Sequence, residues 1–264
     1  MAQAHLVLRR TALVTGASRG IGRAIAQALA GRGMRVAVHY RAQAEAAHEV
    51  RDHLAGEGHV ACQADLADRA ATERLWAGVV RTFGHVDVLV NNAGVFFDHP
   101  PLSTELDEWA EAWQATLSAN LIGPANLSLL AARSMAGQPE FGDLRFGRGR
   151  IVNMSSRGAF RGEPDAPAYG ASKAALNSLG QSMAKALAPQ RIFVYCVAPG
   201  FVETDMAAAL LAGPAGPGIV AQYPMGRVSS PEEVAQVAAF CALDAPAAMT
   251  GSIIDVNGAS YLRT

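Results

Sequence analysis

The chain has 264 residues, half of them hydrophobic, and a formal net charge of −1. Lys and Arg form no long runs, so the composition excludes a general nucleic-acid-binding or anionic-membrane-binding surface. The first residues lack the features of a signal peptide, and no apolar stretch is long enough to span a bilayer. Cys62, Cys196 and Cys241 form no closely spaced pair, so we expect reduced thiols and a cytoplasmic protein.

Short apolar runs rich in β-branched residues alternate along the chain with longer stretches of helical period. Strands are expected at 11–15, 35–40, 59–64, 86–92, 150–156, 191–197 and 252–256, and helices at 20–32, 43–57, 68–83, 105–136, 168–188 and 231–243. This alternation predicts an α/β fold, a doubly wound parallel seven-stranded sheet of Rossmann type with helices on both faces. Because these elements take up nearly the whole chain, we expect a single domain over residues 1–264.

The first strand–helix junction reads TGASRGIG, from Thr15 to Gly22. Its glycines, Gly16, Gly20 and Gly22, allow backbone N–H groups to approach a ligand closely, and the following helix N-terminus carries partial positive charge. A tight turn that needs glycine for packing alone is the alternative. The place of the turn, at the first junction of a doubly wound sheet, favours a dinucleotide phosphate site.

The end of the second strand indicates which dinucleotide would bind. NAD sites commonly carry an acidic residue there, whereas this chain reads VAVHYRA, with Tyr40 and Arg41. Arg19 in the glycine turn is a second cation, and two guanidinium groups suit a 2′-phosphate. NADP(H) is therefore predicted over NAD(H), with two merely solvated arginines as the alternative. His39 is expected beside the cofactor by position only.

Four polar residues farther along the chain are candidate catalytic groups. Tyr169 and Lys173 in YGASK are four residues apart, so one helical turn places them on the same face, although such pairs also occur by chance. Ser156 ends an expected strand, at the edge where ligands bind in this architecture. Asn120 interrupts an apolar helix and needs a hydrogen-bonding partner.

Two segments break the alternation of strands and helices. Residues 136–149 are polar and rich in glycine, and we expect a surface loop there. Residues 207–224 contain several prolines and glycines, and a loop of this length is more often a functional lid than a plain connection. We therefore expect a substrate segment at about 203–224.

Seven short motifs follow one another between the first strand and the last. They are TGASRGIG (15–22), NNAG (91–94), SAN ending at Asn120, Ser156, YGASK (169–173), PGFVETDM (199–206) and VNGA (256–259). In this combination the chain resembles the short-chain dehydrogenase/reductase family in its single-domain form. Within that family it is most similar to β-ketoacyl-[acyl-carrier-protein] reductase-like members, at APGFVETDM and PEEVAQVAAFCA.

The resemblance implies a Ser156–Tyr169–Lys173 triad assisted by Asn120. Tyr169 would exchange a proton with the substrate oxygen, and Ser156 would hold that oxygen; Ser155 is the adjacent alternative, but the interval to Tyr169 favours Ser156. The reference pKa of a phenol is about 10, and the Lys173 ammonium and an oxidised nicotinamide would lower it. The family counterpart of Asn120 bends its helix and anchors a water that links the lysine to solvent.

The resemblance also implies a set of cofactor-binding residues. Asp65 and Leu66 would contact adenine, while Asp68 is the better candidate for the helix cap. Val202 and Thr204 would meet the nicotinamide carboxamide. The complete expected set is Gly16, Ser18, Arg19, Gly20, Ile21, Gly22, Tyr40, Arg41, Asp65, Leu66, Asn92, Ala93, Gly94, Tyr169, Lys173, Pro199, Gly200, Val202 and Thr204. No metal site is expected, since neither histidines nor carboxylates have ligand spacing.

The expected activity is NADP(H)-dependent hydride transfer between the nicotinamide and a small carbonyl or alcohol substrate, with 3-oxoacyl thioesters as one candidate. An acidic acyl carrier protein would need a basic docking surface, and candidates for it, if they are not simply solvated, are Arg145, Arg148, Arg150, Lys185 and Arg191. The resemblance implies a homotetramer, or a homodimer, packed through the 105–136 and 168–188 helices and the last strand.

Four other functions compete with this one. A non-catalytic dinucleotide-binding sensor or scaffold is the alternative of another class, and related proteins of that kind have typically lost the tyrosine or the lysine. An NAD-dependent alcohol or sugar dehydrogenase is the alternative within the family. Sugar epimerisation is disfavoured because it usually needs a longer chain, and enoyl reduction because those enzymes space their tyrosine and lysine farther apart than YGASK does.

Overall fold

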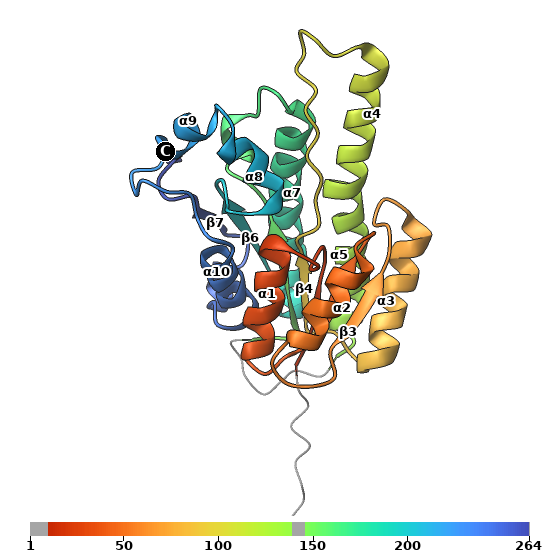
Figure 1. The fold of residues 1–264 in the computed structure, drawn as a ribbon. Coiled ribbons are helices and arrows are strands. Elements are labelled where there is room, and N and C mark those ends of the chain that lie inside the picture. Colours follow the sequence, from red (N-terminus) through yellow and green to blue (C-terminus); the bar gives the residue numbers. More distant parts are fainter. Residues whose placement is uncertain (1–9, 139–145, 264) are drawn as a thin grey trace, which may run out of the picture.

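The computed structural model describes residues 10–138 and 146–263, which form a seven-stranded parallel sheet in the order β3-β2-β1-β4-β5-β6-β7 (Figure 1). The strands are β1 (Thr11–Val14), β2 (Arg35–Tyr40), β3 (Val60–Gln63), β4 (Val88–Asn91), β5 (Gly149–Met154), β6 (Ile192–Pro199) and β7 (Ile253–Val256). The helices are α1 (Gly20–Gly31), α2 (Ala44–His53), α3 (Arg69–Phe83), α4 (Leu106–Leu117), α5 (Gly123–Ala136), α6 (Gly158–Arg161), α7 (Pro167–Leu187), α8 (Asp205–Ala212), α9 (Gly216–Val220) and α10 (Pro231–Leu243). The predicted doubly wound fold is confirmed.

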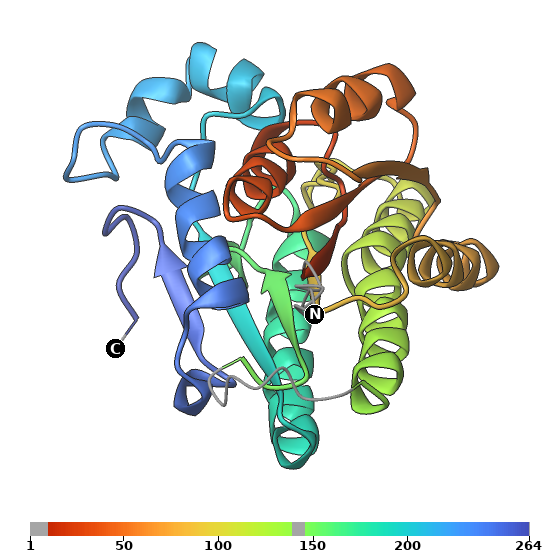
Figure 2. The same cartoon turned by 90° about the horizontal axis from the view of Figure 1, so that it is seen from below.

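Helices cover both faces of the sheet, as Figure 2 shows. Along β1, Ala12 and Val14 pack into a core with α1, α2 and α10, whereas Leu13 between them packs into a second core with α3, α5 and α7. The same alternation recurs along β4, β5 and β6. Burial on both sides explains why these strands read as continuous apolar runs.

Capping side chains set where two of the helices begin. The Asp68 carboxylate accepts the Ala70 N–H at the start of α3. Asp68 therefore caps this helix, as predicted in preference to Asp65. Ser230 and Glu233 form a reciprocal capping box at the start of α10. Each cap satisfies N–H groups that a helix cannot pair internally.

Two expected elements differ in the structure. The expected helix 105–136 is divided into α4 and α5 by a π-helical turn, Ser118–Ile122. The expected loop 207–224 contains α8 and α9, because the run AAALLA favours helix and Pro217 occupies the first turn of α9, where proline is tolerated. Of the expected loop 136–149, residues 139–145 lie outside the described ones.

The strand order reverses between β1 and β4, so the loops that follow these two strands diverge and leave a crevice at the carboxyl edge of the sheet. Val14 pairs with Val90, and this register sets TGASRGIG beside NNAG. Both motifs therefore reach the same edge. Within the two described ranges, no helix is long and apolar enough to cross a membrane.

Candidate active site

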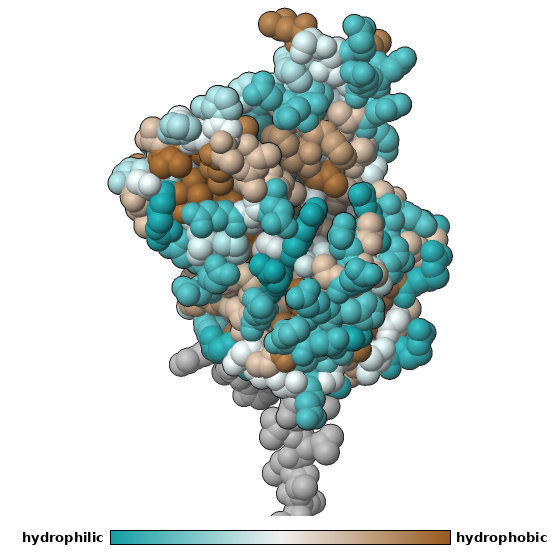
Figure 3. Space-filling view, in the orientation of Figure 1, coloured by the Kyte–Doolittle hydropathy of each residue, from teal (hydrophilic) through white to brown (hydrophobic). Residues whose placement is uncertain are grey.

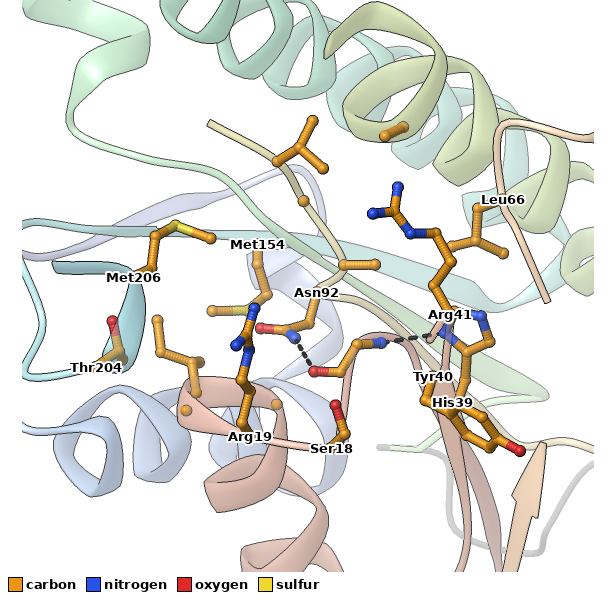
Figure 4. Close-up of a pocket in the computed structure, with 18 of the residues that line it drawn as sticks. Ser18, Arg19, His39, Tyr40, Arg41, Leu66, Asn92, Met154, Thr204 and Met206 are labelled. Carbon is orange, nitrogen blue, oxygen red and sulfur yellow. Dashed lines mark hydrogen bonds between the residues drawn. The ribbon is translucent and has the colours of Figure 1, made fainter. Parts of the chain in front are cut away.

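A cleft of about 340 Å³ opens at this carboxyl edge (Figure 4). The predicted residues that line it are Gly16, Ser18, Arg19, Gly20, Ile21, Gly22, Tyr40, Arg41, Asp65, Leu66, Asn92, Ala93, Gly94, Tyr169, Lys173, Pro199 and Thr204. Asn120, Ser156, Gly200 and Val202 do not line it and lie behind or beside those that do. The surface around α1, α2 and α3 is mostly polar, whereas apolar side chains gather level with α7, α8 and α9 (Figure 3).

The glycine turn combines an anion-binding geometry with tight packing. Gly16 and Gly20 have φ of +62° and +54°, a left-handed conformation that favours glycine. A Cβ on Gly22 would lie 2.3 Å from the Gly16 carbonyl oxygen, so that glycine is needed for packing as well. No described side chain caps the start of α1, and its first turn carries no acid. Its first N–H groups are therefore available to an anion.

His39 ties the glycine turn to two neighbouring strands, a role that the sequence did not predict. Its Nδ1 accepts the Gly16 N–H at 3.1 Å, so the ring proton lies on Nε2, which donates to the Ala64 carbonyl at 3.1 Å (Figure 4). The ring is buried, and burial lowers its pKa to about 4. A histidine inside an otherwise apolar strand was the only signal in the sequence.

Replacing His39 with glutamine should make the free energy of unfolding depend less on pH below about 6.5. An unfolded histidine titrates at 6.5 and the folded ring at about 4, so the unfolded state binds the proton first as the pH falls. The free energy of unfolding then drops as the pH falls from 6.5 to about 4, by about 1.4 kcal/mol per pH unit and about 3 kcal/mol in total.

Urea denaturation between about pH 7.5 and 4 measures this slope for the wild type and for His39→Gln. The matched control is His48→Gln, because His48 is exposed on α2. We expect the control to keep the wild-type slope. Equal slopes in the wild type and His39→Gln would contradict the assignment.

The outer end of the cleft carries two cations. Tyr40 ends β2 and Arg41 follows it; Arg41 and Arg19 are both exposed and both line the cleft. Figure 4 shows the two guanidinium groups extending into the pocket. Asp65 also lines this end, but its Oδ1 already accepts the Ala67 N–H at 2.9 Å. The two cations suit a phosphate better than a bare ribose hydroxyl.

The NNAG segment after β4 holds the glycine turn from the other side. The Asn92 amide donates to the carbonyl oxygens of Thr15 and Gly16 at 2.8 and 3.2 Å. The Thr15 hydroxyl oxygen accepts the Ala93 N–H at 2.9 Å. These residues therefore fix the turn besides lining the cleft.

Tyr169 and Lys173 lie one turn apart on α7, as their spacing predicts. The Lys173 Nζ is 5.7 Å from the centre of the Tyr169 ring and donates a 2.8 Å hydrogen bond to the Met154 carbonyl oxygen at the end of β5. The lysine side chain is buried, and burial lowers its pKa to about 8. The ammonium is thus held in place and gives up its proton more readily than an exposed lysine.

Burial raises the pKa of the Tyr169 phenol to about 12, although a hydrogen bond with the Ser156 side chain acts in the opposite direction. A lowered pKa was expected from the Lys173 ammonium together with an oxidised nicotinamide; with the protein residues alone, the pKa of the phenol is raised. The physical reason is that loss of solvent outweighs the ammonium, whose hydrogen bond goes to the Met154 carbonyl. The phenol is therefore protonated at neutral pH and suited to donate a proton.

The two adjacent serines after β5 have different partners. Ser155 is buried, and its hydroxyl donates to the Lys173 carbonyl oxygen at 3.4 Å. The Ser156 Oγ accepts the Gly158 N–H at 3.0 Å and contacts the Tyr169 phenol, whose pKa it lowers. Although Ser155 is the one that lines the cleft, the contact with the phenol favours Ser156 as the functional serine.

Asn120 lies in the π-helical turn between α4 and α5 and is fully buried. Its Oδ1 accepts the Val95 N–H at 2.8 Å, and its Nδ2 donates to the Val95 carbonyl at 2.9 Å. A Cβ on Gly94 would lie 3.3 Å from Asn120 Oδ1 and 3.5 Å from Lys173 Nζ. The π turn thus brings the amide, the glycine and the ammonium together, as π turns at functional sites often do.

The PGFVET segment contributes unequally to the cleft. Pro199 and Thr204 line it, whereas Gly200 packs against the Tyr223 hydroxyl with no room for a Cβ. The Val202 side chain is buried, and its backbone bridges to Ser229. Only the first and last of the four expected residues therefore line the cleft.

A second unpredicted residue, His99, fixes the start of α7. Its Nε2 accepts the Ala168 N–H at 3.1 Å, and its Nδ1 donates to the Phe97 carbonyl at 2.8 Å. The Phe96 ring packs edge-on against the Tyr169 ring, with 5.0 Å between centres. The loop after β4 therefore positions the tyrosine from two sides.

Of the residues suggested for a basic docking surface, Lys185 is exposed on α7, whereas Arg148 and Arg150 bond to backbone carbonyls of the protein. Arg150 is fully buried and donates to the Cys241 carbonyl at 2.9 Å, and Arg148 donates to the carbonyls of Ala136 and Gln138. Both lie at the start of β5, at the edge of the sheet opposite to the cleft. Arg145 lies outside the described residues. The prediction is wrong for Arg150, because its guanidinium is buried in the protein interior and is not at the surface.

Known proteins are similar to this chain in sequence and in fold. Residues 16–259 match the family model described as Enoyl-(Acyl carrier protein) reductase. The chain is 36% identical over 253 residues to the 3-oxoacyl-[acyl-carrier-protein] reductase FabG of Escherichia coli, covering 96% of this chain and 98% of that one. It is 37% identical over 257 residues to FabG of Staphylococcus aureus, with 97% and 99% covered. The crystal structure of a short chain dehydrogenase from Burkholderia cenocepacia in complex with NADP superposes with a TM-score of 0.83 at 35% identity, covering 96% and 98%.

Proposed function

The chain belongs to the short-chain dehydrogenase/reductase family, and we propose that it is an NADP(H)-dependent oxidoreductase that interconverts a carbonyl compound and an alcohol. The observation that carries the proposal is that Tyr169 and buried Lys173 lie one helical turn apart in the cleft that also holds the glycine turn, with Ser156 beside the phenol. A non-catalytic dinucleotide sensor would need the turn but not this second group of residues.

The cleft fits a dinucleotide with a 2′-phosphate. Among the described residues no side chain caps the start of α1, Arg19 and Arg41 lie at the outer end of the cleft, and Gly94 leaves open the space beside Lys173. The Burkholderia relative is in complex with NADP, which supports NADP(H) over NAD(H). When bound, the nicotinamide supplies the hydride for reduction or accepts it in oxidation.

Residues of the chain carry out the proton transfer that accompanies the hydride transfer. In the reductive direction the Tyr169 hydroxyl donates its proton to the carbonyl oxygen while the carbonyl carbon receives the hydride, and the Ser156 hydroxyl donates a hydrogen bond to the same oxygen. The raised pKa of Tyr169 keeps this donor protonated at neutral pH. The Lys173 ammonium stabilises the phenolate that remains. Asn120 holds the backbone that packs against the ammonium.

A 3-oxoacyl thioester is the substrate class that the comparisons support best, since the E. coli and S. aureus relatives are 3-oxoacyl-[acyl-carrier-protein] reductases. The matching family model is described by enoyl reduction, but the short Tyr169–Lys173 interval favours the carbonyl reaction. Phe96 and Met206 are exposed apolar side chains at the cleft, and they suit an apolar acyl group beside the reacting carbon.

An NADPH-oxidation screen tests this function. Acetoacetyl-CoA, its truncated N-acetylcysteamine thioester, ethyl acetoacetate and crotonyl-CoA are each offered with NADPH and with NADH. We expect oxidation with the 3-oxo compounds, none with crotonyl-CoA, and higher kcat/KM with NADPH. Binding of NADPH without turnover of any ketone would support the sensor or scaffold. Preference for NADH would support the NAD-dependent alcohol or sugar dehydrogenase.

We also propose a homotetramer, or a homodimer, packed through α4, α5, α7 and β7, in the cytoplasm. Ile122 and Leu129, in the π turn and on α5, are large apolar side chains about half exposed, which a partner subunit would cover. The thiols of Cys62, Cys196 and Cys241 are free, which suits a reducing compartment. Light scattering at micromolar concentration should give an oligomeric mass, and a monomeric mass would contradict the assembly.

A further inference from the structure

Arg157 follows Ser156 directly, yet the proposed reaction gives it no role. Its side chain is 1% exposed, and none of the described ion pairs includes it. Its Nη2 donates to the Gln222 side-chain oxygen at 3.0 Å, and the guanidinium lies over the rings of Phe201 and Tyr223, 5.1 and 5.4 Å from their centres. Burying a guanidinium on two ring faces and one amide is costly, so a purely structural site would more simply hold an apolar residue.

The partners of Arg157 form the base of the substrate segment. Phe201 leads out from β6 toward α8, and Gln222 and Tyr223 follow α9 on the way back (Figure 1). The Tyr223 hydroxyl oxygen accepts the Phe201 N–H and occupies the space beside Gly200. The two legs of the segment are therefore joined to each other, and Arg157 packs on both of them.

The backbone around Arg157 connects this base to the reacting groups. The Arg157 N–H donates to the Pro199 carbonyl at 2.8 Å, where Pro199 lines the cleft. One residue earlier, Ser156 contacts the Tyr169 phenol, and one residue later, Gly158 donates to Ser156 Oγ. A single short turn thus carries both the hydroxyl beside the phenol and the side chain that holds the segment.

We propose that Arg157 is a positioning residue that holds the base of the substrate segment, formed by Phe201, Gln222 and Tyr223, at a fixed place relative to Ser156. The proposal rests on the carbonyl–alcohol activity proposed above. Because α8 and α9 are carried by this base, loss of the guanidinium loosens the enclosure of the substrate. The phenol, the ammonium and the glycine turn make no contact with the Arg157 side chain and stay in place.

Arg157→Met keeps the length and the apolar stem but removes the guanidinium. We expect the KM for the 3-oxo substrate to rise by at least about tenfold, with kcat within about threefold and the Kd of NADPH within about twofold, because only substrate enclosure is weakened. The matched control is Arg161→Met, since Arg161 bonds the same Gln222 oxygen at 3.3 Å from an exposed position. Its KM should stay within about twofold of wild type.

A pair of conservative substitutions tests whether Arg157 positions the substrate segment or only stabilises the fold. Arg157→Lys alone cannot bond Gln222 and lie on both rings at once, so its KM should also rise. Adding Gln222→Glu restores a charged contact to the returning leg and should bring the KM back toward wild type. A KM unchanged in Arg157→Met, or a loss shared equally between kcat and NADPH affinity, would overturn the proposal.

Limited proteolysis with thermolysin tests the same idea without turnover. In the NADPH-bound protein, cleavage within 207–221 should be faster in Arg157→Met than in Arg161→Met. It should be slowed again in the double variant that combines Arg157→Lys with Gln222→Glu. Equal cleavage rates in the two single variants would contradict the role of Arg157. If the wild type reduces no ketone, the proposed function fails, and the proteolysis comparison alone decides the role of Arg157.

Discussion

Replacing Tyr169 with phenylalanine should lower the rate of ketone reduction by about 10²–10⁴-fold, the usual contribution of a positioned proton donor. The change removes the hydroxyl that contacts Ser156 and keeps the ring that packs edge-on against Phe96. The fold of α7 and the position of Lys173 should therefore persist. We expect the Kd of NADPH to stay within about twofold of wild type.

Steady-state NADPH oxidation and a fluorescence titration with NADPH measure the two quantities separately. Tyr40→Phe is the matched control, because Tyr40 lines the same cleft and also loses only a hydroxyl. Its turnover should stay within about threefold of wild type. Activity of Tyr169→Phe within a few-fold of wild type would remove the phenol from the mechanism, and a matching loss of NADPH affinity would indicate a damaged cleft instead.

Most of the fold was predictable because local pattern and global arrangement agree. Continuous apolar runs separated by helical stretches specify a parallel sheet covered on both faces, whereas the order of its strands comes from the structure alone. The helices α8 and α9 were missed because proline and glycine were interpreted as loop signals, whereas Pro217 stands where a helix tolerates it. The π turn at Asn120 was not predicted from the local pattern, although the family resemblance implied that this asparagine bends its helix.

The candidate site was predictable where a spacing fixes geometry. Tyr169 and Lys173 share a face because four residues make about one helical turn. The choice between Ser155 and Ser156 rested on the family interval, and the contact of Ser156 with the phenol agrees with it. The contacts of His39 depend on which strands become neighbours, and the pKa of Tyr169 depends on burial. Neither property can be predicted from the local sequence.

Replacing Arg41 with alanine should weaken NADPH much more than NADH. A lost charged hydrogen bond costs about 1–3 kcal/mol, which corresponds to about a 5- to 150-fold rise in the Kd of NADPH. NADH lacks the 2′-phosphate, so its Kd should change by about twofold or less. Because Arg41 is exposed, salt screens the contact, and the effect should shrink as ionic strength rises.

Fluorescence titrations of both coenzymes, at low and at physiological salt, measure this difference. Arg23→Ala is the matched control, since Arg23 is an exposed arginine on α1 that does not line the cleft, and it should leave both Kd values near wild type. Arg19→Ala should act in the same direction as Arg41→Ala, because both guanidinium groups extend into the pocket (Figure 4). Equal losses for NADPH and NADH in Arg41→Ala would refute the phosphate assignment, since an arginine that recognises the 2′-phosphate cannot affect a coenzyme without one to the same degree.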